Sequence, residues 1–280
     1  MTQSLLLCTD LDRTLIPNGE APESPDARPR LARLVARPEV TLVYVTGRHL
    51  SLVREAIAEY QLPVPDILIG DVGTSIYDIG ADAWTPLLDW QEELGRDWAG
   101  LDRETLAARL ADIPLLRPQE PSKQAPYKLS SYAPIDVDSA ALLMEVGARL
   151  ESLGVRANLI WSLDEAAAVG LLDVLPSRAS KYHAIEFLMR RLGHNASTTL
   201  FAGDSGNDLE VLVSPIPAVL VANGHPEVRE RARRESATAG LADRLYCARG
   251  DWSGMNGNYA AGILEGIAHF RPDLIDLLET

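Results

Sequence analysis

The residues best suited to chemistry in this 280-residue chain lie in the segment LLLCTDLDRTL, residues 5–15. Asp10 and Asp12 stand two positions apart where an apolar run ends, and Thr14 follows two positions later. Residues i and i+2 of an extended segment point to the same side. The two carboxylates are therefore predicted to face one substrate, as a nucleophile and a general acid/base would. The side chain of Arg13, which lies between them, is predicted on the opposite face.

Two further apolar runs, VTLVYV and TTLFAG, also end in polar groups. The polar residues that follow these runs are Thr46, Gly47, Arg48, Asp204, Asn207 and Asp208. Ligands of open parallel sheets bind beyond the carboxyl ends of the strands, so neighbouring strands would bring these groups together with the first two aspartates. Carboxylates this close repel one another, and Mg²⁺ both relieves the repulsion and bridges to phosphate oxygens. A Mg²⁺ site is predicted here, although each motif alone is also typical of a strand-end turn.

Lys181 gives an independent indication of an anionic ligand. Ser180 is predicted to be the N-cap of the helix SKYHAIEFLMRRLG, which ends at Gly193, and this places Lys181 in the first helical turn. A cation there opposes the helix dipole by roughly 0.3–1 kcal/mol. A dianionic phosphate in front of the helix would reverse that penalty. The alternative is a solvated surface lysine.

The elements that must position these groups alternate between strand and helix in the first and last parts of the chain. Short apolar runs such as ILIG and AVLVAN, separated by amphipathic segments, are typical of a parallel sheet covered on both faces. The middle of the chain combines amphipathic helices with alternating, antiparallel-type strands. We predict an α/β fold with a Rossmann-like parallel-sheet core over residues 1–81 and 172–280, interrupted by a smaller α+β domain over residues 82–171.

Composition narrows the classes of partner. The net charge of −14 argues against nucleic acid and against an anionic membrane surface. No run approaches 18 apolar residues, and the N-terminus lacks a basic region followed by an apolar stretch, so the expected location is cytoplasmic. The two cysteines, Cys8 and Cys247, are too few for a disulfide framework and are predicted to be small buried residues.

Taken in order, these motifs resemble those of the haloacid dehalogenase superfamily of phosphotransferases. DLDRT resembles the first motif, VTGR the second, Lys181 the third and GDSGND the fourth. The segments DVGTSIY, PYKLSSY, DVLPSRASK and GNYAAGILEGIAHF further resemble the sucrose-phosphate phosphatase branch. The resemblance covers most of the chain and implies a Rossmann-like core with a cap domain inserted after the second motif.

With this resemblance, we expect phosphomonoester hydrolysis through an aspartyl-phosphate, with Mg²⁺ as the cofactor. Asp10 would be the nucleophile, and Asp12 would protonate the leaving group and then activate water. The metal ligands would be the Asp10 carboxylate, the Asp12 backbone carbonyl and Asp204. Asp208 would bind the metal through a water molecule or would contact the residues that bind it. The phosphoryl oxygens would be held by Thr46, the Gly47 N–H, Lys181 and Asn207.

The sugar side of the substrate is expected at the cap and its hinge. The resemblance implies a sugar contact at Lys128, with Gly73 and Thr74 at the hinge as further candidates. Arg48 is a candidate both for contacting substrate and for ordering the site. Members of the branch usually carry a glutamate, implied to be a sugar contact, at the position of Ser75. The sequence therefore leaves open sucrose 6-phosphate and another glycosyl phosphate, such as mannosylfructose phosphate or a glycosyl-phosphoglycerate.

The predicted cap also holds four of the five tryptophans, and core packing explains them better than sugar stacking does. They are Trp84, Trp90, Trp98 and Trp161, of which Trp90 and Trp98 are predicted to share a helix face.

Two rival functions remain beside a sugar-phosphate phosphatase. One is a phosphotransferase or mutase that passes the phosphoryl group to another sugar. The other is a non-catalytic sugar-phosphate-binding module, which the presence of every motif acid disfavours. The expected partners are a small-molecule sugar phosphate and a glycosyltransferase that supplies it, and both monomer and dimer are open.

Overall fold

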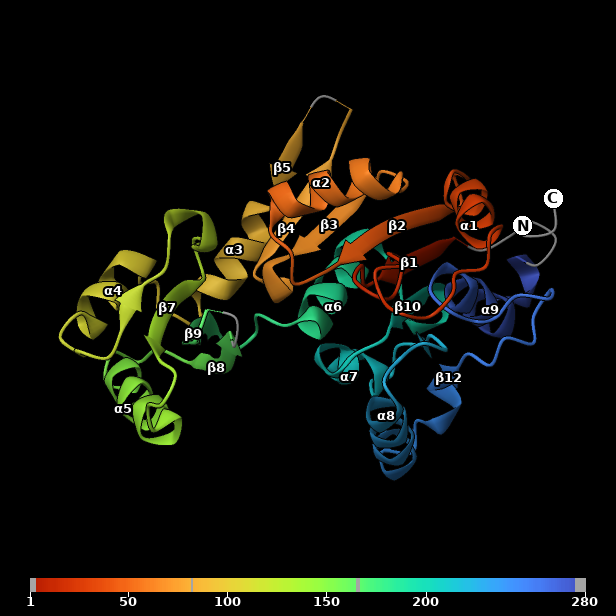
Figure 1. The fold of residues 1–280 in the computed structure, drawn as a ribbon. Helices are drawn as coiled ribbons and strands as arrows, with labels where there is room; N and C mark the ends of the chain where they lie inside the picture. The colour runs from red at the N-terminus through yellow and green to blue at the C-terminus, as the bar shows by residue number, and fades with distance from the viewer. Residues whose placement is uncertain (1–3, 82, 165–166, 275–280) are drawn as a thin grey trace.

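The computed structural model describes residues 4–81, 83–164 and 167–274, and within them the chain forms two β-sheets (Figure 1). The larger sheet has eight strands in the order β12-β11-β10-β1-β2-β3-β4-β5, and the smaller has four in the order β6-β7-β9-β8. Pairing is parallel from β12 to β3 and antiparallel from β3 to β5 and throughout the smaller sheet. The predicted fold class, a parallel-sheet α/β core with an inserted α+β cap, is confirmed.

The parallel strands of the larger sheet are short and buried. Every residue of β1, β3, β10 and β11 is buried, as expected for strands that helices cover on both faces. In sheet order the strands are β12 Leu245–Cys247, β11 Ala218–Leu220, β10 Thr199–Gly203, β1 Leu5–Thr9, β2 Val40–Val45, β3 Ile67–Gly70, β4 Ser75–Ile79 and β5 Trp84–Pro86.

Helices cover both faces of this sheet because strand side chains alternate in direction. Leu5 and Leu7 of β1 belong to a buried cluster with α1, α2 and α9, whereas Leu6 and Cys8 belong to another with α3, α6, α7 and α8. Cys8 and Cys247 are buried and free, as predicted. None of the helices in the described part of the chain is long and apolar enough to cross a membrane. The core helices are α1 Ala27–Val35, α2 Leu50–Tyr60, α3 Leu88–Gly95, α6 Lys181–Leu192, α7 Leu209–Leu212, α8 Pro226–Thr238 and α9 Ala260–Phe270.

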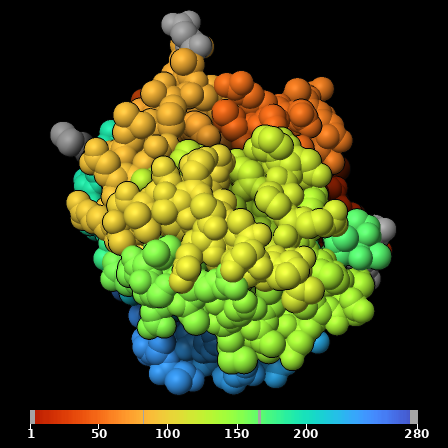
Figure 2. All heavy atoms as spheres, turned by 90° about the vertical axis from the view of Figure 1, so that its left-hand side faces the viewer, coloured from red at the N-terminus to blue at the C-terminus, as the bar shows by residue number. Residues whose placement is uncertain are grey.

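The smaller sheet and two helices form the cap, which has a hydrophobic cluster of its own. Side chains such as Leu106, Val146 and Leu172 meet in this cluster. Figure 2 shows the cap from outside, where its yellow and green residues cover most of the view and the orange residues of the core lie above them. The cap elements are α4 Arg103–Leu110, β6 Arg117–Pro118, β7 Leu129–Pro134, α5 Ser139–Glu151, β8 Ala157–Asp164 and β9 Val169–Pro176.

The two sheets do not divide at the predicted domain boundaries. Strand β5, which contains Trp84, belongs to the larger sheet, and Trp90 of α3 packs against Phe187 of the core with 5.0 Å between ring centroids. At the other end, β9 continues the cap sheet to Pro176. Residue 82, the predicted start of the cap, lies outside the described residues. We propose that the cap begins after α3 and ends with β9.

Trp90 and Trp98 pack in hydrophobic clusters, as expected, but in two different ones. Trp90 and Trp98 are only 1% and 0% exposed. They do not share a helix face, because α3 ends at Gly95 and Trp98 packs in the cap cluster while Trp90 packs in the core. The predicted spacing argument was therefore wrong. The predicted packing is confirmed by the burial of Trp90 and Trp98, whereas Trp84 and Trp161 are only partly buried.

Asp97 ties together the chain segments that cross between core and cap. Its buried carboxylate accepts hydrogen bonds from the guanidinium of Arg156 at 2.5 Å, the hydroxyl of Ser177 at 2.9 Å and the backbone N–H of Arg178 at 2.8 Å. A buried carboxylate needs such partners to offset the loss of its hydration. The network orders the return from the cap immediately before the helix that starts with Lys181.

Candidate active site

Three strand ends meet at one edge of the larger sheet. The strands β10, β1 and β2 are neighbours, and Thr9 at the end of β1 pairs with Ala202 on one side and Tyr44 on the other. The backbone N–H of Asp10 donates to the carbonyl of Ala202 at 2.9 Å, which holds Asp10 next to the end of β10. The segments that follow the three strands therefore lie together, as the parallel pattern predicts.

Lys181 lies at the centre of this edge and is only 2% exposed. Its Nζ donates to the Oδ1 atoms of Asp10 at 2.8 Å, Asp208 at 2.7 Å and Asn207 at 3.2 Å. Burial lowers the pKa of Lys181, but the charges of Asp208 and Asp10 outweigh burial and raise the pKa above its usual range. Ser180 caps the helix by accepting a hydrogen bond from the His183 N–H at 3.2 Å. The first-turn lysine is therefore a buried cation held by carboxylates, and the surface alternative is wrong.

Asp10, Asp204 and Asp208 form a compact set of acids. One oxygen of each lies within 4.8 Å of one oxygen of the other two. Burial, aided by the nearby Asp208 and Asp204 and opposed by Lys181, raises the pKa of Asp10 to about 7. Burial and the charge of Asp208 raise the pKa of Asp204 to about 6. The carboxylates are thus held in a place that disfavours their own negative charge.

The donor set fits a hard divalent cation. Mg²⁺ prefers carboxylate and carbonyl oxygens, and one or two carboxylates with water complete its shell. Asp204 Oδ2 is buried and receives no hydrogen bond, although Arg13 Nε lies 3.3 Å away. Both oxygens of Asp208, in contrast, accept hydrogen bonds, Oδ1 from Lys181 and Oδ2 from the N–H groups of Asp204 and Ser205, each at 3.1 Å. Asp10 and Asp204 are therefore better placed than Asp208 to bind a cation directly.

Without metal, these raised pKa values predict that the folded protein gains stability as the pH falls from about 8 to about 5. The ordinary carboxyl value is 3.8, so in this range the folded state binds protons at Asp10 and Asp204 that the unfolded state does not. The Asp10→Asn variant removes one disfavoured charge. In EDTA at high pH it should unfold several degrees above the unmodified protein, since about 1 kcal/mol shifts Tm by about 2–4 °C.

Thermal unfolding followed by circular dichroism measures this difference. The advantage of Asp10→Asn should shrink toward acid pH, because the unmodified Asp10 becomes protonated there. A variant that is less stable than the unmodified protein at high pH, or a difference that does not change with pH, would contradict the assigned electrostatics.

Asp12 occupies a different environment from Asp10. Its side chain is 41% exposed and accepts two hydrogen bonds from Arg48, from Nε at 2.8 Å and from Nη2 at 2.6 Å, and one from Asn18 Nδ2 at 2.7 Å. Partial burial raises the pKa of Asp12, but the hydrogen bonds from Arg48 and Asn18 outweigh it, and the pKa lies below its usual value. Arg48 therefore orders an acidic side chain of the site in this structure.

The prediction that the side chain of Arg13 lies on the face opposite to Asp10 and Asp12 is wrong. The residue has a positive φ of 59°, which turns the backbone, and its Nε lies 3.3 Å from Asp204 Oδ2. The turn is held by Asn18, whose side chain accepts from the Arg13 N–H at 2.8 Å, and by Asn223, which donates to the Arg13 carbonyl at 2.6 Å. Alternation of side chains along an extended segment does not apply in this turn.

A hollow of about 360 Å³ opens over these groups, and the residues that line it include Asp10, Asp12, Gly47, Arg48, Asp204 and Asn207. Most of the residues that line it are charged or polar, which suits a polar, charged ligand rather than a large apolar one. Thr46 is 1% exposed, and its hydroxyl accepts from the Arg48 N–H at 3.1 Å. Thr14 lies beneath the acids, with its Oγ1 3.4 Å from both Asp10 Oδ2 and Asp204 Oδ1. Thr14 therefore links two acids of the site.

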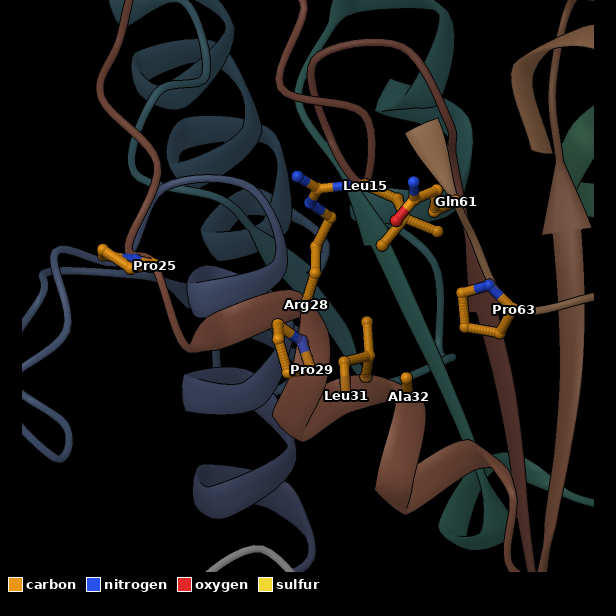
Figure 3. A pocket seen from close by; sticks show the side chains of 8 residues that line it. All are labelled: Leu15, Pro25, Arg28, Pro29, Leu31, Ala32, Gln61 and Pro63. Atoms are coloured by element: carbon orange, nitrogen blue, oxygen red, sulfur yellow. The ribbon is translucent and has the colours of Figure 1, made fainter. Parts of the chain in front are cut away.

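Another hollow of about 230 Å³ lies at α1 and contains none of the predicted site residues (Figure 3). Its basic side chain, Arg28, pairs with Glu23 and donates to the backbone carbonyl of Tyr60 at 2.6 Å. Prolines line much of the remaining wall, including Pro25, Pro29 and Pro63. The chemistry-bearing residues thus gather at the strand ends and not in this hollow.

Comparison with known proteins identifies the family. A family model described as sucrose-6F-phosphate phosphohydrolase matches residues 3–271. The chain belongs to this family. It is 53% identical over 280 residues to a HAD-like hydrolase of Nitrosococcus oceani, a match that covers 100% of this chain and 75% of that protein.

Proteins named as sucrose-phosphatases are also similar. Sucrose-phosphatase 2 of Nicotiana tabacum is 32% identical over 277 residues, and the match covers 95% of this chain and 59% of the tobacco protein. The sucrose-phosphatase of Synechocystis sp. PCC6803, solved with sucrose and phosphate, superposes with a TM-score of 0.68 at 27% identity and covers 96% of this chain and 98% of that one. The predicted resemblance to sucrose-phosphate phosphatases is confirmed, and with it the haloacid dehalogenase fold and the class of phosphoric monoester hydrolases. This family member spans 59% of the tobacco enzyme's length.

The predicted sugar residues lie at the junction of core and cap in this member of the family. Gly73 is packed so closely that a Cβ there would lie 2.4 Å from the carbonyl oxygen of Ser180, and its own carbonyl accepts from Trp90 Nε1 at 3.1 Å. The hydroxyl of Thr74 is buried and donates to the Asp71 carbonyl at 3.0 Å. Gly73 and Thr74 therefore have structural contacts in the hinge.

Lys128 remains a candidate to contact the sugar. It lies just before β7, with its Nζ 3.8 Å from Asp173 Oδ2 of β9. Asp173 and Asn18 were not among the residues predicted from the sequence, and the orientation of Arg13 was predicted wrongly. The only signal for Asp173 was its place in DVLPSRASK, eight residues before Lys181.

Proposed function

We propose that this protein is a Mg²⁺-dependent sugar-phosphate phosphatase that acts through an aspartyl-phosphate on Asp10. The observation that carries the proposal is the buried Lys181, which joins Asp10 to Asp208 beside the acid set of Asp10, Asp204 and Asp208. Such a site has a carboxylate nucleophile, a cation for phosphoryl oxygens and oxygen ligands for a metal. Family membership supports the same reaction class.

In the first step, a carboxylate oxygen of Asp10 forms a bond to phosphorus while the bond from phosphorus to the sugar oxygen breaks. Asp12 gives its proton to the departing oxygen. In the second step water attacks phosphorus, Asp12 takes a proton from it, and the bond from Asp10 to phosphorus breaks. Asp10 is released as a carboxylate, and the products are free sugar and phosphate.

The remaining groups hold the phosphoryl oxygens and the metal. We assign Thr46, the Gly47 N–H, Lys181 and Asn207 to the phosphoryl group, and Asp10, the Asp12 backbone carbonyl and Asp204 to Mg²⁺, with Asp208 behind them. When bound, Mg²⁺ supplies positive charge that lets an anionic nucleophile approach an anionic phosphate. Lys181 supplies a second, permanent positive charge because its pKa is raised.

Asp12 must carry a proton when it acts as an acid, and its hydrogen bonds from Arg48 and Asn18 oppose protonation. A dianionic phosphate that enters the hollow competes for the guanidinium of Arg48, and this competition weakens the pairing. Substrate binding would thereby favour the protonated form of Asp12 where it is needed. Arg48 in this account both orders the free site and responds to the substrate.

A disaccharide phosphate such as sucrose 6-phosphate is the substrate class that we propose. The similarity to sucrose-phosphatases of tobacco and Synechocystis supports this class. Because Ser75 stands where the branch usually has an acid, another glycosyl phosphate is an equal test case. A glycosyltransferase would supply such a substrate.

Phosphate release from a panel of sugar phosphates tests the proposal. The panel contains sucrose 6-phosphate, trehalose 6-phosphate, mannosylfructose phosphate, a glycosyl-phosphoglycerate and glucose 6-phosphate, each assayed with Mg²⁺ and with EDTA. We expect one glycosyl phosphate to exceed the others by about 10³ in kcat/KM, which is about 4 kcal/mol of discrimination. EDTA should abolish the activity.

Adding a free acceptor sugar separates hydrolysis from phosphotransfer, since a transferase would yield a new sugar phosphate. Release that persists in EDTA would overturn the metal assignment. No release from any member of the panel would overturn the proposed function.

A further inference from the structure

The turn between β3 and β4 carries a buried acid that the proposed mechanism does not use. Asp71 is 9% exposed and lies directly after β3, and its backbone φ of 50° is positive. Burial raises the pKa of its carboxyl, and the Ser75 hydroxyl opposes this shift in part. A carboxylate can accept about four hydrogen bonds. Because Asp71 forms no ion pair among the described residues, acceptor positions remain for a ligand.

The turn is wedged between the two elements that would hold the phosphoryl group. The Asp71 N–H donates to the Arg48 carbonyl and the Val72 N–H to the Thr46 carbonyl, each at 3.1 Å. Gly73 packs against the carbonyl of Ser180 at the start of α6. Asp71 therefore belongs to the rim of the phosphate site.

Across from this rim, the cap presents charged groups that are only loosely paired. Burial has the largest effect on the pKa of Asp71; the positive charge of Lys128 lowers this pKa and the negative charge of Asp173 raises it. Lys128 Nζ and Asp173 Oδ2 are 3.8 Å apart, too far for a direct hydrogen bond. Asp173 also accepts a hydrogen bond from Ser130 of β7. The junction thus offers carboxylate acceptors and an ammonium donor between phosphate site and cap.

We propose that Asp71 is a specificity-determining residue, whose carboxylate accepts hydrogen bonds from hydroxyl groups of the sugar part of the substrate at the junction of core and cap. The hydroxyl groups of a neutral sugar can donate to the carboxylates and accept from the ammonium group of Lys128. A second anion would be repelled by Asp71 and Asp173. The inference rests on the proposed function, because it places the sugar beyond a phosphoryl group bound at Asp10. It assigns part of the sugar recognition to the core as well as to the cap.

The test compares a sugar phosphate with p-nitrophenyl phosphate, which has no hydroxyl groups beside its phosphate. The variant is Asp71→Asn, since asparagine tolerates a positive φ and keeps the shape of the side chain. Asp71→Gly is the second variant. It removes the side chain, so it excludes new hydrogen bonds made by the amide of the introduced asparagine. Asp78→Asn is the matched control, an exposed acid on the same hairpin.

We expect Asp71→Asn and Asp71→Gly to lower kcat/KM for the preferred glycosyl phosphate by about 10- to 100-fold, the range for losing hydrogen bonds to a charged group. Activity on p-nitrophenyl phosphate should stay within about twofold, and Asp78→Asn should change neither. Calorimetric titration of the same sugar phosphate into Asp10→Asn, with and without Asp71→Asn, should show the loss as weaker binding.

An equal loss on both phosphate esters would overturn the inference, because Asp71 would then only position the phosphate loop. No loss on either ester would overturn it as well. Both results leave an active sugar phosphatase and spare the proposed function. If the unmodified protein hydrolyses no glycosyl phosphate, the proposed function itself fails and the inference fails with it.

Discussion

Replacing Asp10 by Asn should abolish phosphate release, with a loss on the order of 10⁴–10⁶ in kcat. The amide keeps the size of the side chain and an oxygen for the hydrogen bond from Lys181, which is 2.8 Å from Asp10 Oδ1. It cannot form the acyl phosphate, because an amide oxygen is a poor nucleophile compared with a carboxylate. Initial rates of phosphate release from the preferred sugar phosphate measure the effect.

The matched control for this substitution is Asp136→Asn, which alters an exposed acid of the cap. It should keep the full rate. Because the Asp10→Asn protein stays folded in this account, it should still bind sugar phosphate in calorimetry. A variant that retains more than about 1% of the rate would exclude Asp10 as the nucleophile.

Replacing Lys181 by Met should damage both catalysis and folding. The substitution leaves Asp10 and Asp208 buried without the cation that holds them. Breaking a buried ion pair from one side costs about 3–5 kcal/mol of stability. Loss of a preorganised charge next to the transferred phosphoryl group should lower kcat by about 10²–10³. Urea unfolding and phosphate release measure the two effects.

The double variant Lys181→Met with Asp208→Asn separates the two roles. It removes one of the uncompensated charges, so a large part of the lost stability should return while the rate stays low. Equal recovery of rate and stability would mean that Lys181 acts only by holding the fold together. A single variant with unchanged stability would contradict the buried charge network itself.

The sequence was sufficient to predict the core of the site because parallel topology imposes it. Once apolar runs were interpreted as parallel strands, the groups that follow β1, β2 and β10 had to share one edge of the sheet. The N-cap at Ser180 and the left-handed residue Gly193 marked both ends of α6 correctly. Local rules thus placed Lys181 in the first turn of its helix, and the resemblance to the haloacid dehalogenase motifs assigned it to the site of the acids.

The features that the sequence did not predict lie in turns and in strands without a clear sequence pattern. The side chain of Arg13 points to the site because its backbone adopts a positive φ, which no periodicity predicts for an arginine. The strands β4 and β5 were missed because they are short antiparallel additions to a parallel sheet, and β9 because its GLLDVLP run lacks clear alternation. The cap ends that we propose differ from the predicted ones for this reason. Asp71 was not singled out from the sequence, because the hydrogen bonds that place its turn beside Thr46 and Arg48 join residues more than twenty positions apart.

The most direct test of the central claim is to trap the phosphoryl group on Asp10. The protein is mixed with its preferred sugar phosphate and Mg²⁺, quenched in acid within milliseconds, digested and examined by mass spectrometry. We predict one added phosphoryl group on the peptide that contains Asp10 and none in the Asp10→Asn variant. Rapid phosphate release with no modified peptide at any quench time, or modification of another residue, would contradict it.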